Sequence, residues 1–333
     1  MKLVNEKLIA MNNPISFADI RGVAVGNVQD ANAATGVTVF RLTVPSPAAV
    51  EVFGGGPASR ETETLAPERN HPLNAVVFSG GSAYGLAVAD GVMRCLEAHG
   101  IGYDTGLALV PIVCQSCIYD LGYGSASIRP TPDMGYQACE ATFLTNDPRS
   151  GNIGAGTGAT VGKAAGMMQG QKSGIGYAAW QTGRLQVGVA VLLNSYGDVF
   201  ADGKKIAGML TPDRQHFADS YTTLLQQGGD NLFVSNTTLV AVFTNGDFSP
   251  SQLRHLARMA SVGLARGINP AFTTADGDTV YAVSVGEKTD KVDVSLDAVG
   301  ALAATLVEKA LADAVYSSRI SDEEYLRHIP SMT

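Results

Sequence analysis

Short apolar runs rich in β-branched residues recur along the chain, with glycine-rich breaks between them. Runs of this length and composition predict β-strands, and several lack a polar side, so we expect both faces of those strands to be buried. The predicted strands span residues 37–42, 48–53, 75–78, 107–113, 187–193, 238–243 and 280–285.

Apolar and small residues at helical spacing predict further helices over residues 82–98, 158–168 and 296–316. Another helix has a clear start signal, because Ser249 supplies an N-cap, Pro250 takes the first helical position and Gln252 completes a capping box. We expect this helix to end at Gly267.

Strands occur in clusters and helices in pairs, without strict alternation. This order favours an α+β fold of stacked sheets flanked by helices over a doubly wound parallel sheet. No repeat or linker divides residues 1–333, which predicts a single domain. The polar stretch 202–236 separates two core strands and is the predicted exposed connection.

Glycine is unusually abundant, at 38 of 333 residues, although 45% of the chain is hydrophobic. The absence of a Gly-X-Y period excludes collagen, and the apolar content excludes disorder. The glycines are therefore expected to serve tight turns and close backbone approaches.

The charge balance, 23 Lys and Arg against 31 Asp and Glu, contains no basic run and predicts no nucleic-acid partner. The longest apolar run, near residues 187–193, is far shorter than the roughly 18 residues that a membrane span needs. Charges at Lys2, Glu6 and Lys7 argue against a signal peptide. We expect a cytoplasmic protein that does not contact membranes.

Familiar motifs give weak support for metal or nucleotide chemistry. Cys114 and Cys117 have CxxC spacing, but no second pair or nearby histidine completes a site, which favours buried structural thiols. The segment from Gly158 to Lys163 resembles a phosphate loop but has one residue too few between its glycines, and Ala164 follows the lysine. No metal or other cofactor is expected, and Lys163 is predicted to be partly buried and a site candidate.

Polar residues stand at the ends of three predicted core strands. Asn236 and Thr237 precede one strand, Asp276 and Asp278 precede another, and Asn194 ends a third. A hydroxyl nucleophile, a lysine, an amide donor and paired carboxylates are the components of a hydrolase that needs no histidine.

Motifs along nearly the whole chain resemble the self-processing L-aminopeptidase/D-esterase (DmpA) family, which includes β-peptidyl aminopeptidases and nylon-oligomer hydrolase. The resemblance implies an αββα sandwich of the DmpA/ornithine acetyltransferase type, similar to N-terminal-nucleophile hydrolases. The matching motifs are ATGVTV at 34–39, GGGP at 54–57, RET at 60–62, SGGSAYGL at 79–86, VPIV at 110–113, the glycine-rich segment 154–163, NT at 236–237 and DGDT at 276–279.

The family's precursors cut themselves before a Ser or Thr, which then becomes the nucleophile. By this resemblance the cut falls between Asn236 and Thr237 and leaves an α chain of residues 1–236 and a β chain of residues 237–333. The freed α-amine has a reference pKa of about 7.7–8, so it would serve as general base for the Thr237 hydroxyl and explain the missing histidine.

The resemblance also implies roles for the neighbouring residues. Asn194 would donate to the oxyanion, Lys163 would lower pKa values around it, and Tyr119 would hydrogen-bond the hydroxyl or the intermediate. Asp276 and Asp278 would orient the ammonium groups. A threonine nucleophile with an aspartate pair resembles the nylon-oligomer hydrolase branch, which favours amidase chemistry over strict β-peptide specificity.

The sequence therefore predicts an autoprocessed aminopeptidase or amidase that cuts small peptides or amide oligomers through an acyl-enzyme on Thr237. Acyl transfer of the ornithine acetyltransferase type, with the same threonine, is one alternative, and a glycine-rich nucleotide-binding protein is another. The expected partners are the peptide or amide substrate, the two chains of one precursor and, by resemblance, further αβ units in a homotetramer or larger oligomer.

Overall fold

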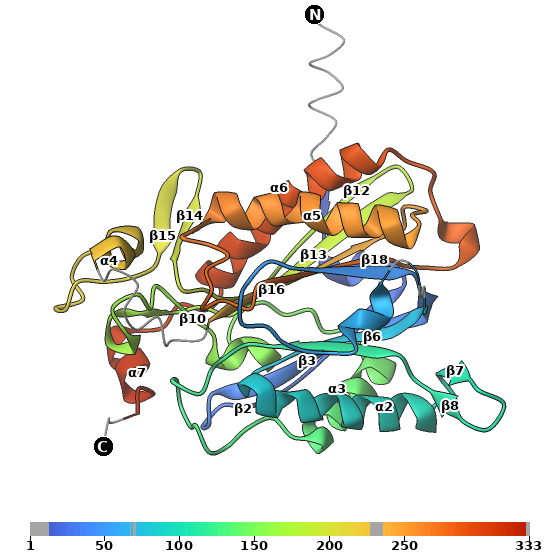
Figure 1. The fold of residues 1–333 in the computed structure, drawn as a ribbon, viewed down its shortest axis with the longest axis horizontal. Coiled ribbons are helices and arrows are strands. Elements are labelled where there is room, and N and C mark those ends of the chain that lie inside the picture. The colour runs from blue at the N-terminus through green and yellow to red at the C-terminus, as the bar shows by residue number, and fades with distance from the viewer. Residues whose placement is uncertain (1–12, 67, 69–70, 227–235, 331–333) are drawn as a thin grey trace, which may run out of the picture.

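The long apolar runs of the sequence form the central strands of two β-sheets stacked face to face (Figure 1). The computed structural model describes residues 13–66, 68, 71–226 and 236–330. Helices α5 (Pro250–Gly267) and α6 (Leu296–Tyr316) cover one sheet, and α2 (Val88–Ala98) and α3 (Pro132–Leu144) cover the other. The predicted α+β fold of stacked sheets between helices is confirmed.

The first sheet is antiparallel except between β16 and β18, which run parallel. Its strands, in spatial order, are β1 (Pro14–Ile15), β12 (Ile175–Thr182), β13 (Leu185–Asn194), β16 (Thr237–Thr244), β18 (Thr279–Ser284) and β4 (Ala48–Val52).

The second sheet is likewise antiparallel except between β6 and β9. Its strands, in spatial order, are β2 (Val23–Asp30), β3 (Thr35–Ser46), β6 (Leu73–Ser79), β9 (Val113–Cys117) and β5 (Ala58–Arg60).

Shorter elements connect these layers or extend from their ends. The remaining strands are β7 (Tyr103–Asp104), β8 (Leu109–Val110), β10 (Thr160–Val161), β11 (Gln171–Lys172), β14 (Asp198–Ala201), β15 (Lys204–Ala207) and β17 (Ile268–Asn269). The short helices are α4 (Ser220–Gln226), α7 (Asp322–Arg327) and the 3-10 turns η1 (Phe17–Asp19), η2 (Thr62–Leu65), η3 (Ser82–Ala87), η4 (Gly154–Gly158), η5 (Met167–Gln169) and η6 (Lys288–Asp290).

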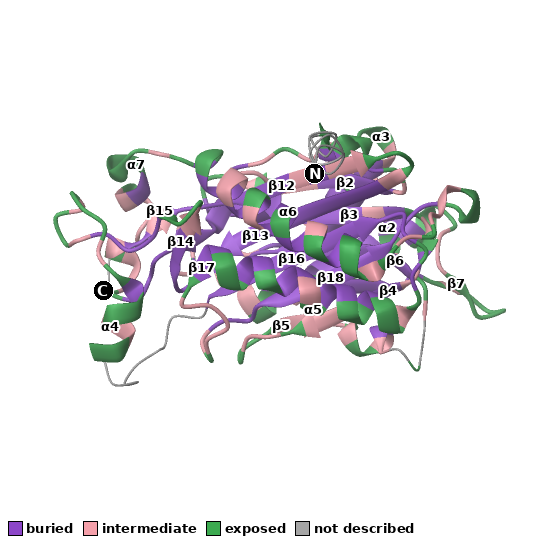
Figure 2. Cartoon of the chain, turned by 90° about the horizontal axis from the view of Figure 1, so that it is seen from above, coloured by how far each residue is buried: buried purple, intermediate pink, exposed green. Residues whose placement is uncertain are grey.

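The core has three apolar layers, because both faces of each sheet are covered. Along β13, Val191 and Leu193 pack under α5 and α6, whereas Ala190 and Leu192 face the second sheet. This alternation explains why the strand sequence is apolar without a polar side. Figure 2 shows the buried central strands, with exposed residues on the outer sides of the helices.

Two local predictions are wrong. Residues 158–168 do not form an α-helix: Gly162 has a φ of +70°, and a Cβ on Gly158 would lie 2.2 Å from the Ala34 carbonyl oxygen. These glycines allow close backbone contact and do not mark a helix face. The predicted strand 107–113 is also divided, because Pro111 separates β8 from β9.

The polar stretch 202–226 forms β15 and α4, whose residues are mostly exposed or half-buried, and residues 227–235 lie outside the described residues.

In the described part of the chain, no helix has the length and apolar character needed to cross a membrane.

Removing a side chain from the layer between the sheets should be costly. Leu192 is fully buried there, so Leu192→Ala should lower the free energy of unfolding by about 2–5 kcal/mol through lost burial and a new cavity. Leu107 is 98% exposed, so Leu107→Ala is the matched control and should change it by less than about 0.5 kcal/mol. Urea unfolding measures both values, and equal losses would contradict the assignment of this layer.

Candidate active site

Three strands of the first sheet bring the predicted site residues to one end of that sheet. Asn194, at the end of β13, is the register partner of Thr237, at the start of β16. Because β18 runs parallel to β16, Asp278 lies directly before β18 and beside Thr238, whose N–H donates to Asp278 Oδ1 at 2.6 Å. Strand pairing therefore joins residues that are far apart in the sequence.

The peptide between Asn236 and Thr237 is fixed by backbone hydrogen bonds to a neighbouring loop. Asn236 N–H donates to the Ala275 carbonyl at 3.0 Å, and the Asn236 carbonyl accepts from Gly277 N–H at 3.1 Å. The Thr237 hydroxyl also donates to the Asn236 carbonyl. Thr237 is only 2% exposed, so its hydroxyl, the preceding carbonyl and a backbone donor meet in a buried place.

Gly277 lies so close to Thr237 that a side chain there would not fit. A Cβ built on Gly277 would be 2.7 Å from Thr237 Oγ1 and 2.9 Å from the Gly56 carbonyl oxygen. The loop before β18 is in turn held by the glycine run after β4, where Gly56 N–H donates to the Asp276 carbonyl at 2.8 Å. The glycines of both motifs thus allow the backbone to surround the Thr237 hydroxyl.

Lys163 is buried beside Asn194. Its ammonium nitrogen lies 2.8 Å from Asn194 Oδ1 and 3.3 Å from the Asn194 carbonyl oxygen. Burial lowers the pKa of Lys163 to about 7, although the charges of Asp276 and Asp120 act in the opposite direction. Near neutral pH the side chain is therefore able both to accept and to donate a proton.

The side-chain amide of Asn194 makes hydrogen bonds through both its oxygen and its nitrogen. Its Oδ1 accepts from Lys163 and from Thr160 N–H at 3.0 Å, and its Nδ2 donates to the Tyr119 carbonyl at 3.0 Å. One Nδ2 hydrogen is used in this contact, and the role of Asn194 as oxyanion donor, which would need the second one, stays a prediction. Tyr119 itself is half-buried, and its backbone carbonyl makes the contact.

The two aspartates are buried but are satisfied by different partners. Asp276 accepts from Thr273 Oγ1 at 2.5 Å and from Tyr196 N–H at 3.4 Å. Burial raises the pKa of Asp276, and Lys163 partly opposes that rise. Burial, together with the charge of Asp276, raises the pKa of Asp278 to about 8.

A second buried lysine and a buried aspartate extend the site, and the sequence reasoning missed both. Lys172 Nζ donates to the carbonyls of Gly156 and Ala159 at 3.1 and 2.9 Å, and burial lowers its pKa to about 7. Asp120 accepts from Thr35 Oγ1 at 2.6 Å, and burial raises its pKa to about 6.

Asp120 immediately follows Tyr119, and Lys172 lies only nine residues after Lys163. Each is a charged residue in a segment of mostly small and apolar residues. This pattern could have indicated a buried charge in the sequence. Gly277 was also missed as a donor, because the sequence gives no indication that its N–H meets the Asn236 carbonyl.

The chemistry available here is that of polar protein groups. A buried hydroxyl, an adjacent carbonyl, a backbone donor and titratable groups with pKa values near neutrality are the components of nucleophilic acyl chemistry.

Cys114 and Cys117 are buried on β9, and burial raises the pKa of each thiol to about 12, consistent with structural thiols. In the described part of the chain, three side chains that could hold a metal lie where α2 and α3 pack together: Cys95 in α2, His99 at its C-terminal cap and Glu140 in α3.

Known proteins resemble this chain along most of its length. Residues 15–323 match the model of peptidase family S58. An uncharacterized aminopeptidase of Mycobacterium leprae is 38% identical over 308 residues, which cover 86% of this chain and 84% of that protein. A 6-aminohexanoate-oligomer endohydrolase of Kocuria sp. is 28% identical over 317 residues, which cover 89% of this chain and 84% of that protein.

Among solved structures, the L-aminopeptidase D-Ala-esterase/amidase of Ochrobactrum anthropi has a TM-score of 0.68 at 19% identity. The match covers 97% of this chain and 99% of that one, and its fold is described as a variant of the N-terminal-nucleophile hydrolase fold. The predicted αββα architecture agrees with this similarity.

The close approach of Gly277 to the Thr237 hydroxyl makes a steric prediction. Gly277→Ala should lower the free energy of unfolding by about 1–3 kcal/mol, because the new methyl group overlaps atoms that strand pairing holds in place. Gly56→Ala is the matched control: its nearest neighbours would lie 3.7 Å away, so we expect a change below about 0.5 kcal/mol. Denaturant unfolding compares the two, and an unaffected Gly277→Ala protein would contradict the contact.

Proposed function

The chain belongs to peptidase family S58, a family of hydrolases, and we propose that it is an autoprocessed aminopeptidase or amidase whose nucleophile is Thr237. The observation that carries this proposal is the environment of the Asn236–Thr237 peptide. The Thr237 hydroxyl lies against the carbonyl that it would attack, and Gly277 N–H already donates to that carbonyl oxygen.

Self-cleavage would begin when Thr237 Oγ attacks the carbonyl carbon of Asn236. The hydroxyl proton moves to a base, negative charge develops on the Asn236 oxygen, and Gly277 N–H stabilises that charge. The C–N bond then breaks, its nitrogen takes a proton, and an ester links Asn236 to Thr237 Oγ. Water hydrolyses the ester, which leaves a carboxylate on Asn236 and a free α-amine on Thr237.

Lys163 is the base we assign to this first step. Before cleavage, the Thr237 nitrogen is part of an amide and has no basic lone pair, so another group must accept the hydroxyl proton. Lys163 contacts Asn194, the strand partner of Thr237, and its pKa of about 7 allows a neutral amine near neutral pH.

Hydrolysis of a substrate amide would use the same nucleophile and the same backbone donor as self-cleavage. After processing, the α-amine of Thr237 is available as general base, directly or through water, and the departure of Asn236 frees Gly277 N–H for a substrate carbonyl. Asp276 and Asp278 would hold the ammonium groups formed during the cycle. The substrate amide acylates Thr237 Oγ and releases an amine, and water then releases the acid.

The proposed substrates are small peptides or linear amino-acid amide oligomers, cut near a free amino end. Relatives named as an aminopeptidase and as a 6-aminohexanoate-oligomer endohydrolase support this range. The processed αβ units are further proposed to assemble into homotetramers or larger oligomers, and the protein is proposed to act in the cytoplasm.

Substitution of Thr237 tests the nucleophile and the cleavage position together. Thr237→Val retains the shape of the buried side chain but lacks the hydroxyl, so the protein should remain one chain of 333 residues and hydrolyse no amide substrate. Thr237→Ser keeps the hydroxyl and should still yield the chains 1–236 and 237–333. Intact mass spectrometry after purification distinguishes these products.

The Val variant should unfold at a temperature close to that of the Ser variant, which shows that loss of cleavage is not loss of fold. Cleavage of the Val variant into the chains 1–236 and 237–333 would contradict the proposal. If the processed protein instead transfers the acyl group to an added amine in preference to water, it would be an acyltransferase.

The pH dependence of self-cleavage tests the assigned base. With a Lys163 pKa of about 7, the neutral amine accumulates as pH rises through neutrality, so the rate should rise about tenfold per pH unit below about 7 and level off above it. The measurement uses precursor from in vitro translation, transferred to buffers on both sides of neutrality and followed on denaturing gels.

Lys163→Met should abolish cleavage at every pH, whereas Lys309→Met, at an exposed position of α6, should leave the profile unchanged. A Lys163→Met precursor that cleaves with the wild-type profile would remove the lysine from the mechanism, while leaving the nucleophile assignment intact.

A further inference from the structure

Helices α2 and α3, which cover the second sheet, approach each other closely through glycines. A Cβ on Gly91 would lie 1.6 Å from the Pro132 carbonyl oxygen, and one on Gly135 would lie 2.3 Å from the Val88 carbonyl oxygen. Cys95 follows Gly91 by four residues on α2, and Glu140 follows Gly135 by five residues on α3.

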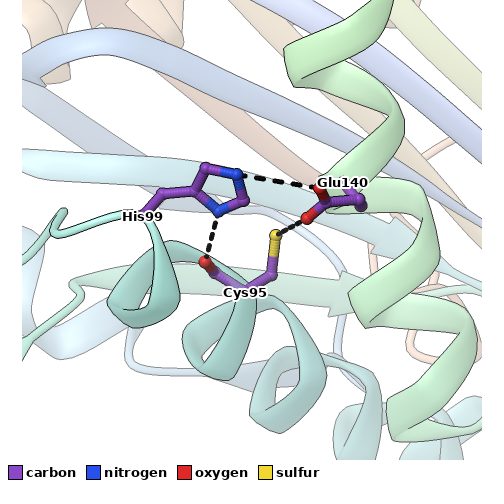
Figure 3. A group of neighbouring side chains, drawn as sticks. All are labelled: Cys95, His99 and Glu140. Carbon is purple, nitrogen blue, oxygen red and sulfur yellow. Dashed lines mark hydrogen bonds and ion pairs between the residues drawn. The ribbon is translucent and has the colours of Figure 1, made fainter.

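Three side chains with metal-binding atoms meet at this place (Figure 3). Cys95 Sγ lies 3.6 Å from Glu140 Oε2, and His99 Nε2 lies 3.7 Å from Glu140 Oε1. All three ligand atoms fall within 4.8 Å of one another. Cys95 lies in the last turn of α2 and His99 caps the C-terminus of that helix one turn later, and Glu140 faces both from α3.

The His99 ring is already oriented as a metal ligand requires. Its Nδ1 lies 2.9 Å from the Cys95 carbonyl oxygen, which can only accept, so Nδ1 carries the proton and a neutral ring keeps the lone pair on Nε2. The ring also stacks on Phe143 with centroids 3.8 Å apart. These contacts fix both the tautomer and the direction of Nε2.

We propose that Cys95, His99 and Glu140 form a binding site for a zinc-like divalent metal ion in the helix layer of the second sheet, whereas Thr237 lies on the first sheet. Tetrahedral zinc with ordinary bond lengths separates a sulfur from an oxygen ligand by about 3.6 Å and a nitrogen from an oxygen ligand by about 3.4 Å. Cys95 Sγ lies 3.6 Å from one carboxylate oxygen and His99 Nε2 lies 3.7 Å from the other, with the three ligand atoms within 4.8 Å of one another. Side-chain movements on the order of 1 Å would bring the sulfur, the nitrogen and one oxygen to the separations that a single ion needs. A water molecule completes the four ligands, since His99 and Glu140 reach the surface.

The charges around the site balance. Binding displaces the Cys95 thiol proton to solvent, so thiolate and carboxylate together neutralise a divalent ion. The carboxyl-terminal end of α2 adds a favourable negative dipole. The guanidinium of Arg41, which lies over Phe143 and interacts with Cys95 and Cys139, opposes a cation but favours the thiolate. The neighbouring Cys95 thiol and burial raise the pKa of Cys139, which precedes Glu140 on α3 and borders the site.

Cobalt titration of the full-length protein tests the site, with Co²⁺ as the probe for zinc. After treatment with a chelator, the wild type should bind one Co²⁺ per chain and show the near-ultraviolet charge-transfer band of a cobalt–thiolate bond, which Zn²⁺ then removes. Cys95→Ser should lose the band. His99→Gln and Glu140→Gln should bind at least about 10-fold more weakly.

Glu97→Gln, on the exposed side of α2, is the matched control for Glu140→Gln, and Cys114→Ser is the control for Cys95→Ser. Both controls should keep wild-type affinity and spectrum. Because His99 is exposed, His99→Gln should fold normally. At the same Zn²⁺ concentration, the rise in unfolding temperature should therefore be equal for the wild type and Glu97→Gln and smaller for His99→Gln. A missing thiolate band, or a band that survives in Cys95→Ser, would overturn the proposal.

Discussion

The structure depends on burying a polar cluster at one end of an otherwise apolar sheet. Lys163, Asn194 and the residues before β18 are almost completely removed from water, so each of their polar atoms needs a partner. Backbone groups supply many of these partners, and they approach closely enough because glycines stand opposite them. The arrangement of strands, loops and glycine runs at this end follows from that requirement.

The same requirement explains which parts of the fold were predictable. The strands β13, β16 and β18 lie between two apolar layers and therefore consist of unbroken apolar runs, which a sequence pattern detects. α5 was predictable because its capping signals are local. By contrast, β12 was missed because glycine, alanine and two aromatic residues replace the usual β-branched pattern, and α3 was missed because small and polar residues obscure its apolar face.

The helix predicted at 158–168 shows how the glycine constraint misleads local reasoning. Small residues at regular spacing suggest a helix face, but here they make room for Ala34 and Met209 from distant segments. The candidate site likewise contains residues that local motifs reveal and a contact that they do not reveal. Thr237 and the two aspartates could be named as candidates because they stand in motifs, whereas the contact between Gly277 and Asn236 depends on how β18 pairs with β16. Such a contact is a property of topology and leaves no local signal.

The titratable groups of the cluster couple the stability of the fold to its chemistry. Lys163 has a pKa near 7 in the folded chain against 10.5 when unfolded, so between these values the unfolded chain binds more protons and stability rises with pH. Asp278 has a pKa near 8 when folded against 3.8, so stability falls as pH rises between those values. The combined contribution of these two groups is therefore smallest near pH 7 to 8. That is also the range in which the two proposed bases, a neutral Lys163 and the α-amine that self-cleavage would free, would act. The proposed chemistry would thus take place where these two groups stabilise the fold least.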